Sequence, residues 1–301
     1  MRHSQIRAFH YVATYGGFSR AADALFLTQP AISDQVRKLE NHYDMLLFSR
    51  QKKQISLTPQ GEKLFEITKR LFEVEHQILD FLTENKAFTT GTLCIKADSA
   101  YHITKPLKKF RESFPDIKVD LKTGNSKDVI ADLLSYDADI GVIGTLPENP
   151  KIQFITLGKS PIIAFTARDN PLARHKSLSI ADLAGCPLVF REKGSQTRLK
   201  LETAALAQGI TLTPAIEAEG REAVQEIVAS GAGIGFVSEK EFSRHANLAA
   251  IRIEGAPILM EEVVAYLKER RNGKLIRTFA AMVRPTMPAP TGSAHRPRSP
   301  L

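Results

Sequence analysis

Between Phe18 and Glu40 the sequence places hydrogen-bonding side chains on one side of a predicted helix and aliphatic side chains on the other. Ile32, Val36 and Leu39 recur at spacings of four and three, which predicts one buried face. The opposite face offers the amide, hydroxyl, carboxylate and cationic groups that read base edges in the major groove of DNA. The alternative is a helical hairpin with a solvated polar face. The candidate DNA contacts are Gln29, Pro30, Ser33, Asp34, Arg37 and Lys38.

A group of basic residues follows this helix. Arg50, Lys52 and Lys53 lie between two short apolar segments within residues 46–57, a pattern that predicts two strands joined by a tight turn, or wing. Cationic side chains at the tip of a wing suit phosphates or the minor groove of DNA. We therefore add these three residues to the candidate DNA contacts, with a solvated charged turn as the alternative.

Hydroxyl and amide groups form a third set, from residue 92 onward. They lie where predicted strands end and predicted helices begin, and such positions offer unpaired backbone N–H groups to an anion. Each could instead be an ordinary helix cap. Asp98, Glu192 and Glu222 nearby would accommodate an amine on a ligand that also carries a phosphonate, sulfonate or carboxylate group. The candidate ligand-binding residues are Ser99, Tyr101, His102, Ser126, Gly194, Ser195, Gln196, Thr197 and Glu222.

The sequence motifs of common catalytic and metal sites are missing. There is no Gly-x-Ser-x-Gly elbow, no Walker lysine loop, no His-Glu-x-x-His and no Cys-x-x-Cys pair. Of the eight histidines only His102 lies at a suspected pocket, where we expect a hydrogen-bonding or packed ring, with a general base as the alternative. We therefore expect no enzyme activity, no cofactor and no metal.

The helix that must follow the wing carries a heptad stripe. It begins after Thr58-Pro59, a cap and a first-turn proline, and extends to about residue 85. Because a lone helix cannot bury a coiled-coil seam, we expect a homodimer, with packing on another part of the same chain as the alternative. The seam residues, spaced 3, 4, 3, 4 and 3 apart, are Leu64, Ile67, Leu71, Val74, Ile78 and Phe81.

From residue 92 short apolar segments alternate with amphipathic ones. This order predicts a mostly parallel sheet covered by helices on both faces. The predicted strands are 93–97, 117–123, 140–143, 162–166, 188–191, 214–218, 234–237 and 263–268, and the predicted helices are about 102–113, 126–135, 195–207, 221–230 and 274–284. Residues 285–301 hold five prolines and no apolar periodicity, which predicts a disordered tail.

The composition fits a globular chain with an anionic partner. The 301 residues include 43% hydrophobic and 25% charged side chains and carry a net charge of +8. No apolar segment approaches the length of a membrane span, and the N-terminus lacks the core of a secretion signal, so we expect a cytoplasmic protein. Cys94 and Cys186 adjoin apolar strands, which favours buried thiols over a redox switch.

The pattern of residues in the first part of the chain resembles that of LysR-type transcriptional regulators. Two positions depart from the family: Asp34, where a basic or neutral residue is frequent, and Gly220, where serine is common. The matching residues are Ala21-Ala22, Thr28-Gln29-Pro30-Ala31, Ser33, Gln35, Leu39-Glu40, Leu47-Phe48, Arg50, Leu57-Thr58 and Gly61.

The resemblance implies an α/β protein with an N-terminal all-α winged helix-turn-helix at 1–58, a long linker and dimerisation helix at 59–89, and a two-lobed effector-binding domain at 92–284. That domain would be similar to periplasmic binding proteins, with lobe I at about 92–161 and 268–284 and lobe II at about 162–267. The candidate ligand residues would then converge on one cleft from both lobes. The implied partners are a double-stranded DNA operator, a small anionic effector and further copies of the chain, as a dimer or tetramer.

Three functions compete at this point. A ligand-responsive transcription regulator is favoured by the hairpin, the wing, the heptad helix and the two-lobed module together. A solute-binding protein shares the two-lobed module but has no use for residues 1–60. An α/β enzyme with an accessory helical domain lacks a catalytic constellation.

Overall fold

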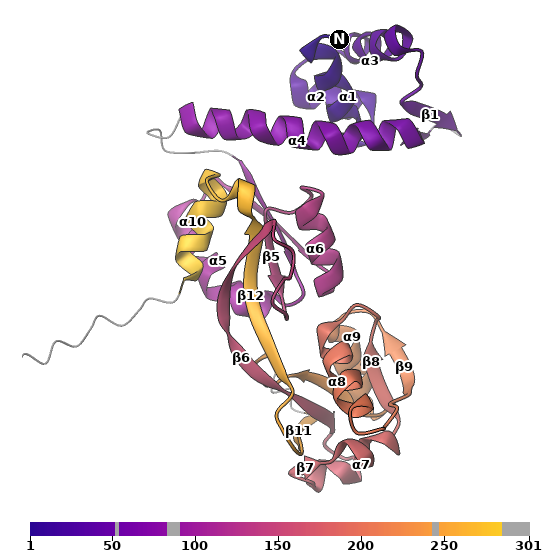
Figure 1. Cartoon of the computed structure of the whole chain (residues 1–301), viewed down its shortest axis with the longest axis vertical. Helices are drawn as coiled ribbons and strands as arrows, with labels where there is room; N and C mark the ends of the chain where they lie inside the picture. The colour runs from indigo at the N-terminus through magenta and orange to yellow at the C-terminus, as the bar shows by residue number, and fades with distance from the viewer. Residues whose placement is uncertain (52–53, 83–90, 243–246, 285–301) are drawn as a thin grey trace, which may run out of the picture. The chain divides into compact units, whose positions relative to one another are not determined.

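The computed structural model describes residues 1–51, 54–82, 91–242 and 247–284, with only the backbone described at positions 50, 51, 54 and 80. The chain divides into two compact units, Met1–Ala87 and Phe88–Leu301 (Figure 1). Within the described ranges, no helix combines the length and the apolar character that crossing a bilayer requires. The predicted tail at 285–301 lies outside the described residues.

Three helices form the core of the first unit. The inner face predicted for the third helix is buried, because Ile32, Val36 and Leu39 are each at most 3% exposed and pack in one cluster with Phe9. Thr28 caps that helix, its hydroxyl accepting a hydrogen bond from the Ala31 N–H at 3.4 Å. The helices are α1 (His3–Tyr15), α2 (Phe18–Leu25) and α3 (Gln29–Tyr43).

A two-stranded wing joins this core to a long helix. Strands β1 (Phe48–Gln51) and β2 (Gln54–Leu57) pair antiparallel, and α4 (Pro59–Leu82) follows. The Glu40 carboxylate accepts hydrogen bonds from the backbone N–H groups of Leu47 and Phe48, at 2.8 and 3.2 Å, which ties the start of the wing to α3. A Cβ on Gly61 would lie 2.1 Å from the Leu47 carbonyl oxygen, so the first turn of α4 packs too closely on the wing for any other residue.

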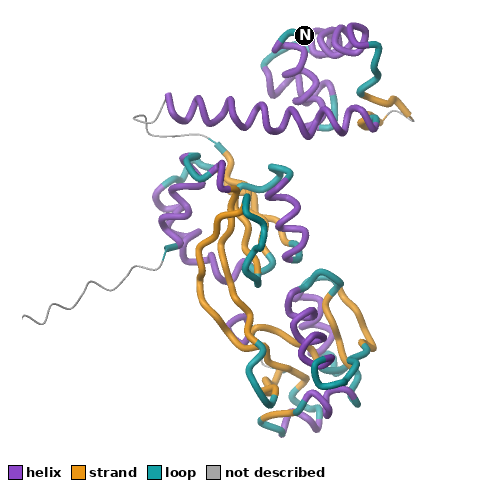
Figure 2. The backbone as a smooth tube through the Cα atoms, viewed as in Figure 1, coloured by secondary structure: helices purple, strands orange, loops and turns teal. Residues whose placement is uncertain are grey.

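The second unit begins with the first lobe of an α/β fold. Its parallel strands lie in the order β4 (Lys118–Thr123), β3 (Thr92–Ala97) and β5 (Ile140–Ile143). Helices flank these strands on both sides (Figure 2). Phe110 and Phe279 make an edge contact with ring centroids 5.7 Å apart, so the last helix returns to this lobe. The helical elements are η1 (Ala100–Ile103), α5 (Thr104–Ser113), α6 (Ser126–Leu134) and α10 (Lys274–Val283).

Two long antiparallel strands cross between the lobes (Figure 1). They are β6 (Ile152–Ala167) and β12 (Leu259–Leu267), which pair from Ile152 with Leu267 to Pro161 with Leu259. Both begin earlier than the predicted 162–166 and 263–268, because their first halves carry polar side chains that hide the strand pattern. Residues 263–265 of β12 also pair with β5. Strand β12 therefore lies between β5 of the first lobe and the crossing strand β6 in one continuous sheet.

The second lobe repeats the plan of the first. Strands β8 (Leu188–Arg191) and β9 (Pro214–Ala218) run parallel, whereas β10 (Gly235–Ser238) and β11 (Leu248–Ile253) pair antiparallel with β6. The sheet is therefore mixed, and not mostly parallel as predicted, because the crossing strands run against their neighbours. The remaining elements are η2 (Pro171–Arg174), β7 (Ser177–Leu178), α7 (Ile180–Ala184), α8 (Gln196–Leu206), α9 (Arg221–Ala229), η3 (Glu239–Glu241) and η4 (Lys268–Arg270).

The two cysteines lie in different lobes and are half-buried, less covered than the sequence predicted. Burial, followed by the nearby Asp139 carboxylate, raises the pKa of the Cys94 thiol. Burial and Asp182 raise the pKa of the Cys186 thiol, which donates a hydrogen bond to the Asp182 carbonyl oxygen at 3.3 Å. Raised pKa values reduce the thiolate fraction, which disfavours redox chemistry at either position.

Candidate functional site

The predicted base-reading face of α3 points away from the core of the first unit. Gln29, Pro30, Arg37 and Lys38 are exposed, and Ser33 is half-buried. The side chain of Arg50 and all of Lys52 and Lys53 lie outside the described residues.

Asp34, the position that departs from the family pattern, forms ion pairs within α3. Its carboxylate lies 2.7 Å from Lys38 Nζ and 3.4 Å from Arg37 Nη2. The hydrogen bond from Lys38 lowers the pKa of Asp34, so this carboxyl is ionised at neutral pH. In the free protein Asp34 therefore orients two neighbouring cations of the same face, a role that the sequence did not indicate.

The heptad stripe of α4 divides into two parts. Leu64 is half-buried and packs against the core of its own unit. The other five seam residues are between 45% and 75% exposed within the chain, which leaves a continuous apolar stripe for a partner: Ile67, Leu71, Val74, Ile78 and Phe81.

The candidate ligand residues of the two lobes meet around Asp98, which follows β3. Its carboxylate accepts a hydrogen bond from Arg191 Nη1 of the second lobe at 2.5 Å and another from the Ser126 hydroxyl of the first lobe at 3.1 Å. The side chains of Asp98 and Arg191 are both 9% exposed.

Burial disfavours the charged forms of Asp98 and Arg191, whereas the charge of each side chain favours the charged form of the other. Burial raises the pKa of the Asp98 carboxyl, although Arg191 counteracts the rise. Burial favours the neutral form of Arg191, but the Asp98 carboxylate raises the pKa of the guanidinium above its ordinary value. Because a guanidinium keeps its proton in proteins and lies in direct contact with the carboxylate, the pair keeps its charges.

A second guanidinium bridges the lobes beside the first. Arg221 opens α9 and donates from Nη1 to the Ser99 hydroxyl of the first lobe at 2.7 Å. The same nitrogen lies 3.1 Å from Glu241 Oε2, and Nη2 lies 3.1 Å from Glu222 Oε1. Glu222 is 74% exposed on its side chain, so it screens Arg221 from the solvent side.

Two helix N-termini face each other next to these pairs. Asn125 caps α6 and Ser195 occupies the cap position of α8, and a Cβ on Gly194 would lie 2.9 Å from Asn125 Oδ1. Ser195 is 1% exposed, and its hydroxyl has no hydrogen-bond partner within the described ranges. Among the described residues, the buried Thr197 makes one weak contact, from its hydroxyl to Met260 Sδ at 4.0 Å. Two hydroxyls at the start of α8 are therefore available to an anion.

Most of the predicted ligand residues thus come together, and the exceptions have physical reasons. Ser126 contacts Asp98 and Ser99 contacts Arg221. The start of α8 lies beside them, with Gln196 close to Gly144 of the first lobe, and it contributes Gly194, Ser195, Gln196 and Thr197. Tyr101 is 56% exposed and belongs to the rim. Arg191 and Arg221 were not predicted as ligand contacts. The sequence signal that could have indicated them is their position, since Arg191 ends a strand and Arg221 begins a helix.

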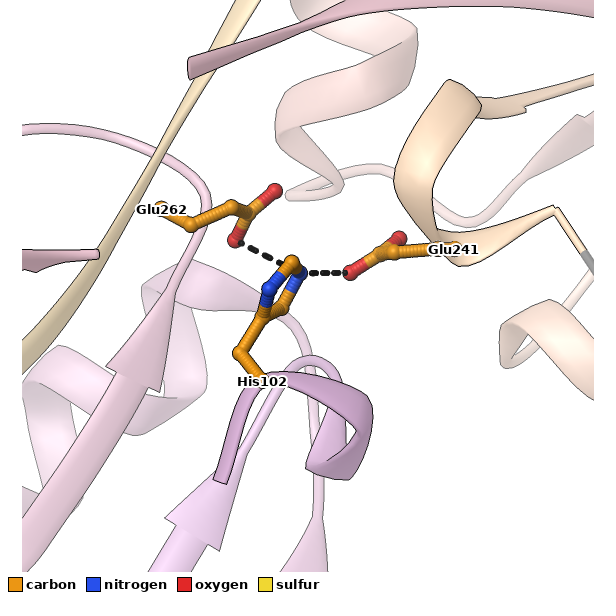
Figure 3. Close-up of side chains that lie close together, drawn as sticks. All are labelled: His102, Glu241 and Glu262. Atoms are coloured by element: carbon orange, nitrogen blue, oxygen red, sulfur yellow. Dashed lines mark hydrogen bonds and ion pairs between the residues drawn. The ribbon is translucent and has the colours of Figure 1, made fainter. Parts of the chain in front are cut away.

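His102 is buried between two carboxylates, Glu241 and Glu262 (Figure 3). Its Nε2 lies 2.8 Å from Glu241 Oε1 and 3.6 Å from Glu262 Oε2. Burial alone would raise the pKa of Glu241, but the hydrogen bond with His102 and the charge of Arg221 lower it. The sequence predicted no such cluster, because His102 and Glu241 are 139 residues apart in the chain.

The chain matches known proteins over both of its units. Residues 3–62 match the family model of the bacterial regulatory helix-turn-helix protein, lysR family, and residues 87–288 match that of the LysR substrate binding domain. The RuBisCO operon transcriptional regulator of Allochromatium vinosum is 30% identical over 285 residues, 93% of this chain and 94% of that protein. The HTH-type transcriptional activator CmpR of Synechocystis sp. is 26% identical over 280 residues, 91% of this chain and 92% of that protein.

Solved structures show the same fold. Full-length OxyR from Pseudomonas aeruginosa, in a variant with one cysteine replaced, superposes with a TM-score of 0.76 at 18% identity and 94% coverage of both chains. The LysR family regulator CbnR, solved in complex with its target DNA, gives a TM-score of 0.66 at 21% identity, covering 94% of this chain and 99% of that one. With the helix-turn-helix and the effector-binding domain both matched in order, the chain belongs to the LysR family of oligomeric, DNA-binding transcriptional regulators, which are not enzymes.

Proposed function

We propose that this regulator reads a double-stranded operator with α3 and the wing, dimerises along α4, and responds to a small anionic effector held between the two lobes of its second unit. Binding of the effector would change transcription of the target genes, and the setting is the cytoplasm, where the chromosome lies. A tetramer built from two such dimers is compatible with the same contacts.

The observation that carries the effector proposal is an internal carboxylate already held by both lobes. Asp98 accepts hydrogen bonds from Arg191 and from Ser126, the first residue of α6. A carboxylate, sulfonate or phosphonate offers the same oxygens, so an effector could replace Asp98 as the partner of Arg191. The buried hydroxyl of Ser195, which has no hydrogen-bond partner within the described ranges, would then donate to the new anion at the start of α8.

The balance of charge around this group supports an effector that also carries an amine. The guanidinium groups of Arg191 and Arg221 contact more carboxylates than there are guanidinium groups. The two positive charges therefore do not neutralise all the negative charges beside them. An anion that displaced Asp98 would leave that carboxylate buried without its cation, which is costly. An ammonium group on the effector could pair with the released carboxylate. A zwitterionic effector therefore suits the site better than a simple anion.

A screen by thermal shift tests the proposed effector class. Small carboxylates, sulfonates and phosphonates, each with and without an amine, are added to the full chain. An effector at a hundred times its Kd should add about 2.7 kcal/mol to the free energy of unfolding. If no compound with an anionic group stabilises the protein, the proposed effector class is wrong.

Ser195→Ala then tests the proposed anion contact. Loss of a charge-assisted hydrogen bond of about 1.5 to 3 kcal/mol should weaken effector binding about ten- to a hundredfold. Stability without effector should stay constant or rise, because the variant removes a buried hydroxyl that lacks a partner. Thr203→Val on the exposed side of α8 is the control and should keep full affinity. Full affinity in Ser195→Ala would mean that Ser195 only supports the helix.

Gel-shift titration with the intergenic DNA upstream of the chain's own gene tests the DNA contacts. Gln29→Ala should lower affinity for the specific operator but leave binding to unrelated DNA unchanged, because amides on α3 would read base edges. Replacing Arg50, Lys52 and Lys53 by glutamine should weaken binding to all sequences alike and flatten its salt dependence. If Gln29→Ala weakens binding to all sequences alike and the wing substitutions weaken binding to the specific operator alone, the proposed roles of α3 and the wing are wrong.

A further inference from the structure

Three metal-ligating side chains from distant parts of the second unit converge on one point (Figure 3). His102 lies in η1 of the first lobe, Glu241 in η3 after β10 of the second lobe, and Glu262 on the crossing strand β12. One ligand atom from each residue lies within 4.8 Å of the other two. The side chains of His102, Glu241 and Glu262 are 6%, 9% and 4% exposed, respectively. All three donors are therefore shielded from bulk water.

Glu262 is the member of this cluster that the protein leaves unsatisfied. Its Oε1 is buried and has no hydrogen-bond partner in the described parts of the chain. A buried carboxyl oxygen without a hydrogen-bond partner is costly to retain, because nothing compensates for the water that it has lost. A cation between the three side chains would supply the missing partner.

We propose that His102, Glu241 and Glu262 form a binding site for one divalent transition-metal ion, of the Zn²⁺, Mn²⁺ or Fe²⁺ class. One imidazole nitrogen with two carboxylate oxygens is a donor set that these ions accept, with water completing the coordination. The imidazole disfavours Mg²⁺ and Ca²⁺, which prefer oxygen ligands alone. Two carboxylates would balance the charge of the ion.

The neighbouring groups suit this role. The two oxygens of Glu241 point to different partners, since Oε1 faces His102 Nε2 and Oε2 lies 3.1 Å from Arg221 Nη1. Glu241 could therefore bind the ion through Oε1 while Arg221 continues to hold Oε2, and such second contacts orient a metal ligand. Because the three ligands lie in both lobes and in a crossing strand, a bound ion would tie the two lobes together at their crossing point. Arg221 contacts both Glu241 of this cluster and Ser99 of the candidate effector site, so the two sites adjoin.

Metal binding to the full chain, stripped with a chelator and dialysed, tests the proposal directly. Isothermal titration with Zn²⁺ and Mn²⁺ should give one ion per chain, and Ca²⁺ should give none at the same concentrations. Co²⁺ should produce visible absorption bands of a site with nitrogen and oxygen ligands.

Two variants and two matched controls make the result decisive. Glu262→Gln and His102→Gln should each lose at least about a hundredfold in affinity, together with the Co²⁺ bands. Glu261→Gln, the neighbouring residue paired with Lys159, and His175→Gln, an exposed histidine, should bind as the wild type does. If His102→Gln fails to fold, Glu262→Gln still decides, because it replaces the carboxyl group with an uncharged amide of nearly the same shape. Equal binding by Glu262→Gln, or no stoichiometric binding by the wild type, overturns the site and leaves a hydrogen-bonded bridge between the lobes.

Discussion

The Arg191 guanidinium of the second lobe donates to the Asp98 carboxylate of the first, with 2.5 Å between Nη1 and Oδ1. Both side chains are buried, so the contact is a desolvated ion pair that joins the lobes. Such a pair contributes less to stability than its geometry suggests, because both charges lost their water. We expect its larger effect to be on specificity, because the pair favours the arrangement of the two lobes in which both groups are satisfied.

Arg191→Met should destabilise the second unit by about 3 to 5 kcal/mol, because Asp98 would remain buried without its cation. Urea unfolding measures this loss. The double variant Asp98→Asn with Arg191→Met should recover part of it, since neither charge is then left alone. Lys108→Met, which breaks an exposed pair with Glu112, should cost no more than about 0.5 kcal/mol. If the losses in the free energy of unfolding from the two substitutions simply add in the double variant, the two side chains do not interact.

The pH dependence of stability should report on Glu262. Its pKa is about 9 in the folded protein and 4.5 in its ordinary state, so the folded chain keeps a proton that the unfolded chain releases. The stability due to that proton is fully present below pH 4.5 and is lost as pH rises through 9. Glu262→Gln keeps a neutral group at all pH values.

The advantage of Glu262→Gln over the wild type should therefore grow from pH 5 to pH 9 in urea unfolding with chelator present. A saturating transition metal should remove this advantage, because it would stabilise the wild type alone. Parallel stability curves for the two proteins would mean that Glu262 is ionised at neutral pH even without metal.

The sequence predicted the elements whose patterns are local. The a/d stripe of α4, the inner face of α3 and the strand–helix alternation of the lobes all follow from spacing within one element. The first half of β6 was missed because Gln153, Thr156 and Lys159 interrupt its apolar character, and only pairing with β12 makes it a strand. Long-range pairing of this kind leaves no trace in a short window of sequence.

The candidate site could be predicted in part for the same reason. Ser99, Ser126 and Ser195 stand at strand ends and helix starts, which are local signals. The partners of Arg191 and Arg221 lie in the other lobe, and only the crossing strands bring them together. The cluster of His102, Glu241 and Glu262 likewise depends on three segments whose meeting cannot be inferred from spacing.

Gly61→Ala should disrupt the first unit. The new methyl group would lie 2.1 Å from the Leu47 carbonyl oxygen, which is backbone and cannot turn aside. We expect loss of at least about 2 kcal/mol in thermal or urea unfolding, since overpacking commonly costs about 1 to 3 kcal/mol. Operator binding should fall with it. Gln60→Ala, at an exposed position of the same turn, is the control. Equal stability of the two variants would mean that α4 can move away from the wing.

Leu71→Asp should separate the proposed dimer. Leu71 is 45% exposed within the chain and lies in the middle of the apolar stripe formed by Ile67, Val74 and Ile78. In an α4 seam, an aspartate would lose its water close to its own counterpart on the second chain, and both effects oppose association. The folding of each chain should be unaffected, because the side chain contributes nothing to the core of its own unit.

Sedimentation velocity should then show a smaller species. Affinity for a two-half-site operator should fall by about a hundredfold, because the second reading helix no longer binds as part of the same assembly. His76→Asp, on an exposed position of α4 outside the stripe, should leave both measurements unchanged. If Leu71→Asp sediments as the wild type does, association depends on the α/β unit, and the exposed stripe of α4 must pack elsewhere.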